Sequence, residues 1–190
     1  MRKEVMVRRG AHALIALTPL YFFLPVELPI EPLRRWMLLV VFFVGVCVFE
    51  IVRLWKGITF LGLRPHEKHQ IASFAWAAAG VTLLLWLFPE EIASGALVAM
   101  AFVDPLAGEL RGAKVRDAVG VPASLVVYFV LCLVTLLTFG DHGILAYAVV
   151  AAFGAIVALP SERFKIRLVD DDFLMLVLPA IVMTGVSFLF

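Results

Sequence analysis

The chain has 190 residues, of which 63% are hydrophobic, and its formal net charge at pH 7 is only +1. Soluble domains are about half apolar, so this composition excludes a soluble globular protein and predicts an integral membrane protein. The near-neutral charge gives no bulk attraction to nucleic acid, and we expect no nucleic-acid partner. Cys47 and Cys132 both lie in apolar runs, which indicates free thiols rather than a disulfide. Asparagine is absent and Gln70 is the only glutamine, which favours a thermophilic prokaryotic source.

Seven apolar runs predict an all-α polytopic bundle of about seven transmembrane helices. Backbone polar groups in lipid must bond within their own segment, which favours helices, and about 20 residues cross a ~30 Å hydrocarbon layer. No repeat divides the chain, so we expect a single integral membrane domain over residues 1–190. The runs cover residues 10–26, 35–54, 71–88, 92–103, 122–140, 143–159 and 173–190.

Lys and Arg are distributed unevenly between the two ends of this predicted bundle. Of the 16 basic residues, all except Arg34 and Arg35 fall in the N-terminal segment or in every second connection between runs. Basic residues collect on the cytoplasmic side of membrane proteins. We therefore expect a multi-pass protein of the cell membrane with a cytoplasmic N-terminus.

The segment VRRGAH (residues 7–12) opens the first run. Arg8 and His12 are four residues apart and share a helix face. Arg8 and Arg9 are explained by anchoring at the cytoplasmic surface, with His12 as an interfacial histidine. The alternative, which the sequence leaves open, is that these residues line a phosphate pocket.

The segment FEIVRLWKG (residues 49–57) closes the second run, and Glu50 and Arg53 lie three residues apart in it. A carboxylate at the bilayer centre costs about 2.5–3.5 kcal/mol, so a glutamate near the end of an apolar run needs a compensating role. We expect Glu50 to orient Arg53 toward a phosphate; an interfacial ion pair is the plain alternative. Glu67 precedes the third run, where a helix N-terminus stabilises a carboxylate.

The fourth run covers only residues 92–103 and stops at Asp104-Pro105. Proline disfavours continuation of a helix, so we predict a fourth helix that is short or broken at Asp104-Pro105 and lines a polar cavity. Asp104 is placed to hold Mg²⁺, a hard cation that prefers carboxylates and substrate phosphates.

The residues after Asp104, in DPLAGELRGAK (104–114), suit a phosphate ligand. Gly108 and Gly112 would let the backbone approach a ligand closely. Arg111 and Lys114 offer donors for phosphate oxygens. A polar reverse turn explains the glycines and the proline, but not an aspartate at the end of so short an apolar run.

Three consecutive aspartates, Asp170 to Asp172, precede the last run. Acidic residues favour helix N-termini, but three adjacent carboxylates repel one another unless a cation lies among them. We therefore predict that Asp171 and Asp172 are metal ligands together with Asp104. On the predicted topology these groups face one compartment, and they supply the parts for phosphoryl or nucleotidyl transfer onto a lipid, with Asp104 or Asp171 as the residue that accepts a hydroxyl proton.

Taken in order, these segments resemble the CTP-dependent polyprenol kinases, the family of dolichol kinase and phytol kinase, which is akin to the phosphatidate cytidylyltransferases. The resemblance covers most of the chain. Its marks are RRGAH, FEIVRL, Glu67, DPLAGELRGAK and an acidic pair, Asp171-Asp172, that follows Glu162. Two positions depart from the family pattern: Phe173 stands where an asparagine usually follows the acidic pair, and Gly112 is offset by one residue.

The resemblance implies a membrane lipid kinase that transfers the γ-phosphate of CTP to a long-chain isoprenoid alcohol at the cytoplasmic interface, with Mg²⁺ as cofactor. The expected catalytic residues are Asp104 and Asp171. The expected metal ligands are Asp104, Asp171, Asp172 and Glu162. The expected nucleotide-binding residues are Glu50, Arg53, Glu67, Gly108, Arg111, Gly112 and Lys114.

Two alternatives remain open at this point. The same fold could serve a cytidylyltransferase that makes a CDP-lipid from CTP and a phospholipid. The chain could also be a small transporter or a non-catalytic scaffold, although a transporter should place ionisable groups near mid-membrane on paired broken helices, and the charges here gather at one face.

Overall fold

The structure is a computed structural model that describes residues 3–29, 33–161 and 169–190. Across these residues it is an all-α bundle of seven α-helices without a strand, which confirms the predicted fold class. Two short 3-10 helices, η1 (Thr18–Phe23) and η2 (Pro65–His69), lie between them. The α-helices are α1 (Lys3–Leu17), α2 (Arg35–Lys56), α3 (Ser73–Leu87), α4 (Glu90–Gly112), α5 (Asp117–Phe139), α6 (Ile144–Ser161) and α7 (Asp171–Ser187).

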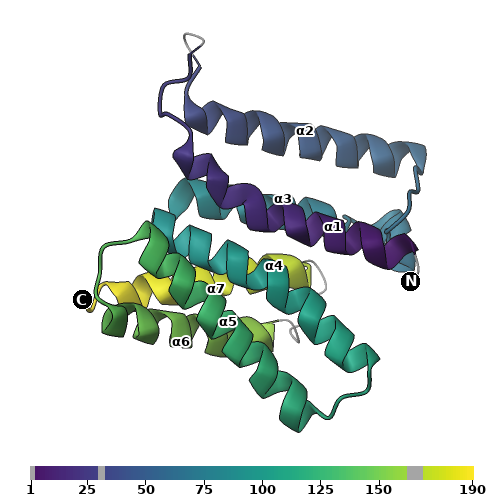
Figure 1. Ribbon diagram of the computed structural model, residues 1–190. Coiled ribbons are helices and arrows are strands. Elements are labelled where there is room, and N and C mark those ends of the chain that lie inside the picture. Colours follow the sequence, from purple (N-terminus) through teal and green to yellow (C-terminus); the bar gives the residue numbers. More distant parts are fainter. Residues whose placement is uncertain (1–2, 30–32, 162–168) are drawn as a thin grey trace.

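Successive helices run in opposite directions, so every second connection lies at the same end of the bundle (Figure 1). The α4 helix lies at the centre and packs against α1, α3, α5, α6 and α7. The α2 helix lies along one edge and contacts α3, while α5 and α6 form the opposite edge. The start of α1 and the ends of α2 and α4 therefore lie at one end, on the right in Figure 1.

Four helices, α2, α4, α5 and α6, are long and apolar enough to cross a membrane, and α3 is a shorter apolar helix. Large apolar side chains are exposed along the outer faces, among them Phe42 and Trp55 on α2, Val126 on α5 and Ile156 on α6. Extended apolar surfaces of this kind are unfavourable in water. The exposed faces are therefore compatible with the predicted membrane environment.

Two glycines allow close packing of the helices that carry the candidate site. A Cβ added at Gly80 of α3 would lie 2.9 Å from Cδ1 of Leu176 on α7. A Cβ added at Gly154 of α6 would lie 2.6 Å from Sδ of Met183, also on α7. Such distances are shorter than van der Waals contact, so any larger residue would displace a neighbour. These contacts fix the position of α7 and hence of its first turn.

The predicted break in the fourth helix is wrong. The α4 helix continues through Pro105 to Gly112, and the chain reverses only at Lys114, whose φ is +56°. Proline removes one helical hydrogen bond, but the central position of α4 supplies packing on several sides. The apolar run ends at Asp104 because one face of the helix borders a polar cavity, while Ala107 one turn later is again buried.

Candidate functional site

A cavity of about 460 Å³ opens between the middle of α1, the end of α4 and the start of α7. Its lining combines arginines, carboxylates and a histidine with Pro105 and Gly108 of α4, which have no polar side chain. The lining residues are Arg8, Arg9, His12, Arg64, Asp104, Pro105, Gly108, Glu109, Arg111 and Asp171. Asp104 and Asp171 thus lie in one cavity although they are far apart in the sequence.

His12 and Asp104 face each other across the inner wall of this cavity. Nδ1 of His12 lies 2.8 Å from the carbonyl oxygen of Arg8. Because a carbonyl only accepts, Nδ1 carries a proton in this contact. Nε2 lies 2.9 Å from Oδ2 of Asp104, which is within ion-pair distance, and it has no other hydrogen-bond partner. His12 is only 7% exposed.

The three aspartates at the start of α7 have different surroundings. Asp170 is the N-cap, and its Oδ1 accepts a hydrogen bond of 3.2 Å from the Asp172 amide. Asp172 is 6% exposed, and its Oδ1 has no hydrogen-bond partner. One donor atom each from Asp172, His12 and Asp104 lie within 4.8 Å of one another. Three helices, α1, α4 and α7, therefore each contribute one potential metal-ligand atom to the same small region.

Arg64, just before η2, faces the outer two aspartates. Its Nη1 lies 3.5 Å from Oδ2 of Asp170 and 3.4 Å from Oδ1 of Asp171. Burial, a hydrogen bond with Asp171 and repulsion from that carboxylate raise the pKa of Asp170 to about 6. A carboxyl group with a raised pKa beside other carboxylates is typical of sites that hold a proton or a cation.

Glu50 and Arg53 form a buried ion pair near the end of α2. Nε and Nη2 of Arg53 each donate to Glu50 at 2.7 Å. Arg53 also donates to the carbonyls of Glu67 at 3.0 Å and Gln70 at 2.7 Å. Glu50 accepts a further 2.7 Å hydrogen bond from the Ala72 amide. The pair therefore joins α2 to the connection that contains η2 and to the start of α3.

Glu67 holds the connection between α2 and α3 in place. Its carboxylate accepts hydrogen bonds from the Arg64 amide at 2.7 Å and from the Ser73 amide and hydroxyl at 3.0 and 2.5 Å. Burial alone would raise the pKa of Glu67, but these hydrogen bonds lower it. The buried carboxylate stays charged and fixes Arg64 beside the cavity.

The predicted nucleotide-binding residues divide into those that line the cavity and those that do not. Gly108 and Arg111 line the cavity, whereas Gly112 and Lys114 are exposed outside its lining. The other three predicted residues are buried and do not line it either. Their polar atoms bond to one another and to the backbone, so they position Arg64 rather than face the cavity. These three are Glu50, Arg53 and Glu67. Glu162 lies outside the described residues.

Two cavity residues, Arg64 and Glu109, have no role in the sequence-based prediction, and neither has Asp170, which lies beside the cavity residue Asp171. Glu109 pairs with Arg9 across the mouth of the cavity. The signal for Arg64 is local: it precedes Pro65, and the Glu67 side chain three residues later accepts from its amide, as in a capping box. Asp170 has a local pattern too, because an aspartate before an apolar run is typical of an N-cap, whereas Glu109 has none.

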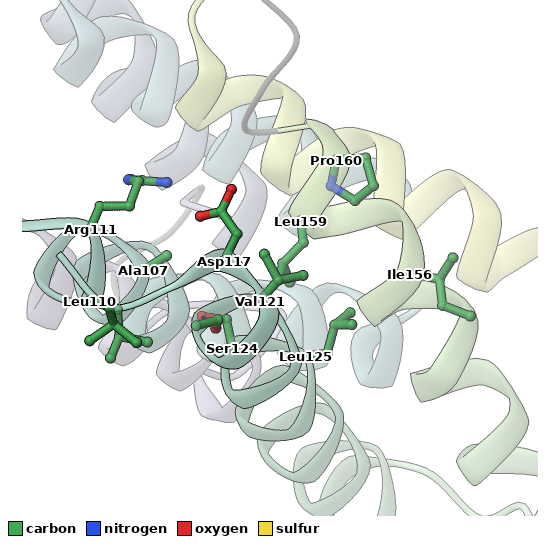
Figure 2. A pocket seen from close by; sticks show the side chains of 12 residues that line it. Ala107, Leu110, Arg111, Asp117, Val121, Ser124, Leu125, Ile156, Leu159 and Pro160 are labelled. Carbon is green, nitrogen blue, oxygen red and sulfur yellow. Dashed lines mark hydrogen bonds between the residues drawn. The ribbon is translucent and has the colours of Figure 1, made fainter.

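A second, mainly apolar cleft of about 290 Å³ lies between α4, α5 and α6. Arg111 and Asp117 lie at one end of it, and Leu125 and Ile156 lie at the other (Figure 2). Arg111 lines both the cleft and the polar cavity. A molecule with a polar head and an apolar tail could therefore occupy the two spaces together.

Comparison with models of known families, with curated proteins and with solved structures finds no match to this chain. The candidate function therefore depends on the site itself and on the resemblance of its sequence segments.

Proposed function

We propose that this protein is a membrane lipid kinase that transfers the γ-phosphate of CTP to a long-chain isoprenoid alcohol. One observation carries the proposal: carboxylates and arginines from α1, α4, α7 and the segment before η2 surround a single cavity beside an apolar cleft. The choice of CTP and of an isoprenoid alcohol comes from the resemblance of RRGAH, FEIVRL and DPLAGELRGAK to the polyprenol kinases. The cavity itself supports a phosphate, a cation and a lipid.

The triphosphate would bind to the arginines of the cavity. Arg8, Arg9, Arg64 and Arg111 all line it, and guanidinium groups bind phosphate oxygens through paired hydrogen bonds. They come from three separate segments, α1, α4 and the segment before η2, so they can surround a phosphate chain rather than contact one side of it. Such preorganised positive charge stabilises the charge that develops on a transferred phosphoryl group.

A divalent cation fits the inner end of the cavity. Asp104 and Asp172 would hold it, because the two carboxylates lie together and Oδ1 of Asp172 is buried without a partner. When bound, the ion would supply charge to the phosphate oxygens. Asp171 lines the cavity, and we assign to it the acceptance of the proton of the alcohol. The alcohol oxygen bonds to the γ-phosphorus, the bond from that phosphorus to the bridging oxygen breaks, and CDP leaves.

The apolar cleft would hold the lipid chain. Val121, Leu125, Ile156 and Leu159 line it, and Arg111 lines both the cleft and the polar cavity. An alcohol bound there would direct its hydroxyl toward the phosphates while its tail stays among apolar side chains. This arrangement places the reaction at a membrane interface.

We place this interface at the cytoplasmic face of the cell membrane, with all seven helices crossing or entering the bilayer. The distribution of Lys and Arg supports that orientation. The polar cavity then opens to the compartment in which CTP is available, and the cleft opens toward the bilayer.

The experiment is a product analysis with purified protein in lipid nanodiscs. CTP labelled in its γ-phosphate is supplied with a long isoprenoid alcohol and a divalent cation, and we expect labelled lipid phosphate and free CDP. Release of pyrophosphate with transfer of CMP to a phospholipid would instead indicate the cytidylyltransferase. An absence of any nucleotide turnover would contradict both enzymes and favour a transporter or a scaffold.

A further inference from the structure

His12 is held with its free ring nitrogen directed at the two innermost carboxylates. Its Nδ1 proton is engaged by the Arg8 carbonyl at 2.8 Å. In metal-binding histidines, the second ring nitrogen commonly donates to a backbone carbonyl or a carboxylate, which fixes the tautomer and leaves the first nitrogen free to coordinate. His12 has this arrangement, with Nε2 as the coordinating atom.

The distances around Nε2 match those between ligands of one ion. Octahedral ligands about 2.1 Å from a cation lie about 3.0 Å apart when adjacent and about 4.2 Å apart when opposite. Nε2 of His12 and Oδ2 of Asp104 are 2.9 Å apart, which is the adjacent distance. Asp172 completes a set in which every pair of donor atoms lies within 4.8 Å. Small side-chain rotations would bring all three onto one ion.

Two of these atoms are buried without a hydrogen-bond partner, which a cation would explain. Nε2 of His12 has no partner besides Oδ2 of Asp104 at 2.9 Å, Oδ1 of Asp172 has no hydrogen-bond partner, and the two residues are 7% and 6% exposed. A buried polar atom without a partner costs free energy, and native proteins contain few of them. A simple His12–Asp104 ion pair would still leave Oδ1 of Asp172 without a hydrogen-bond partner. A shared cation would compensate all three side chains.

The donor set also indicates which kind of cation binds. Mg²⁺ is bound mainly by oxygen, whereas imidazole nitrogen suits first-row transition metals, and Mn²⁺ accepts carboxylate and water oxygens as well. We infer that His12, Asp104 and Asp172 form a three-helix site for a divalent transition-metal ion such as Mn²⁺, with its remaining positions open to the cavity. The use of that ion in catalysis rests on the proposed function, but its binding does not.

The test is Mn²⁺ binding to the full-length purified protein, stripped of metal and without nucleotide or lipid. Electron paramagnetic resonance gives the affinity, and pulsed measurements detect hyperfine coupling from a coordinated nitrogen. We expect a tight Mn²⁺ site with a nitrogen signal in the wild type. In His12→Asn, the nitrogen signal should disappear and the affinity should fall by about tenfold or more. His142→Asn, an exposed histidine at the opposite end of the bundle, is the matched control and should behave as wild type.

Bound Mn²⁺ without nitrogen coupling in the wild type would overturn the inference, and so would unchanged binding in His12→Asn. The wild-type spectrum alone tests for the nitrogen ligand, even if His12→Asn does not fold. Failure of this site is distinguishable from failure of the kinase. A protein that binds Mn²⁺ through nitrogen but turns over no CTP keeps the site and loses the proposed function. A protein that phosphorylates lipid with a purely oxygen-bound ion keeps the proposed function and loses the His12 site.

Discussion

Asp172 and Asp104 lie where water is largely excluded, and each carries a carboxylate that the other repels. Their burial is costly unless a cation or a proton compensates it. Asp172 in particular has an oxygen without any partner. Residues that reduce stability in this way are candidates for a functional role.

Asp172→Asn should therefore separate stability from turnover. In metal-free buffer we expect the variant to melt at the same temperature as wild type or higher, because the neutral amide removes the repulsion with Asp104. Turnover of CTP should fall by at least about 100-fold, because an electrostatic component of the site is lost. Thermal unfolding and product formation are measured on the same preparation. Asp141→Asn, exposed at the other end of the bundle, is the control; normal turnover in Asp172→Asn would contradict the assigned role.

Asp170 gives a prediction about pH. Burial and the neighbouring Asp171 raise its pKa to about 6, above the ordinary value of 3.8. A raised carboxyl pKa means that the proton favours the folded state, so this contribution to stability is full below pH 3.8 and is lost as the pH rises through 6. Asparagine stays neutral and still caps the helix.

We expect Asp170→Asn to stabilise the metal-free protein at pH 8 and to have little effect at pH 4.5. The measurement is the difference in melting temperature between variant and wild type across that range. Asp141→Asn should show no such trend. A stabilisation that grows as the pH falls would have the wrong sign and would contradict the assigned environment of Asp170.

At the scale of elements, the connection between α2 and α3 is held by buried charge. Arg53 bonds to Glu50 and to two carbonyls, and Glu67 bonds to the amides on either side of η2. Together they convert an irregular segment into a fixed support for Arg64. The site therefore depends on residues that never face the cavity.

Glu50→Gln tests this support. The change leaves the buried Arg53 charge without its carboxylate, and breaking a buried pair in this way costs about 3–5 kcal/mol. We expect a clear fall in melting temperature and faster proteolysis within residues 57–72. Glu27→Gln, on an exposed side chain, is the control. Wild-type stability in Glu50→Gln would show that the network does not hold this segment.

Much of the fold follows from the sequence, because each of the seven hydrophobic runs overlaps one α-helix, although the bounds differ by up to nine residues in the first and fourth. The predicted break at Asp104-Pro105 is wrong because the hydropathy of a segment indicates whether its surroundings are apolar or polar. It does not indicate where the helical hydrogen bonds end. Asp104, Asp171 and Asp172 could be chosen from their unusual positions beside apolar runs. The pairing of His12 with Asp104 could not, because it depends on how α1 packs against α4.

For the whole molecule, the important property is that the polar groups of the candidate site gather at one end. Alternating helix directions bring the middle of α1, the end of α4 and the start of α7 together (Figure 1). The outer faces are apolar, and four helices are long enough to cross a membrane. The proposed orientation places this end in the cytoplasm.

Cysteine accessibility tests that orientation. Lys114→Cys, in the connection after α4, should react with a membrane-impermeant maleimide only after cells are opened. Asp141→Cys, in the connection after α5, should react in intact cells. The wild type, with only Cys47 and Cys132, gives the background. Labelling of both positions from the same side would contradict the predicted crossing of α5, and the reverse pattern would contradict the cytoplasmic site.

The most direct measurement is transfer of the γ-phosphate of CTP to a long isoprenoid alcohol by wild type, Asp104→Asn and Asp141→Asn, purified in parallel. Labelled lipid phosphate should form with wild type and with Asp141→Asn, and should be almost absent with a folded Asp104→Asn. Equal product from Asp104→Asn and wild type, or no labelled lipid from wild type under any divalent cation, would contradict the assignment of this cavity as a phosphotransferase site.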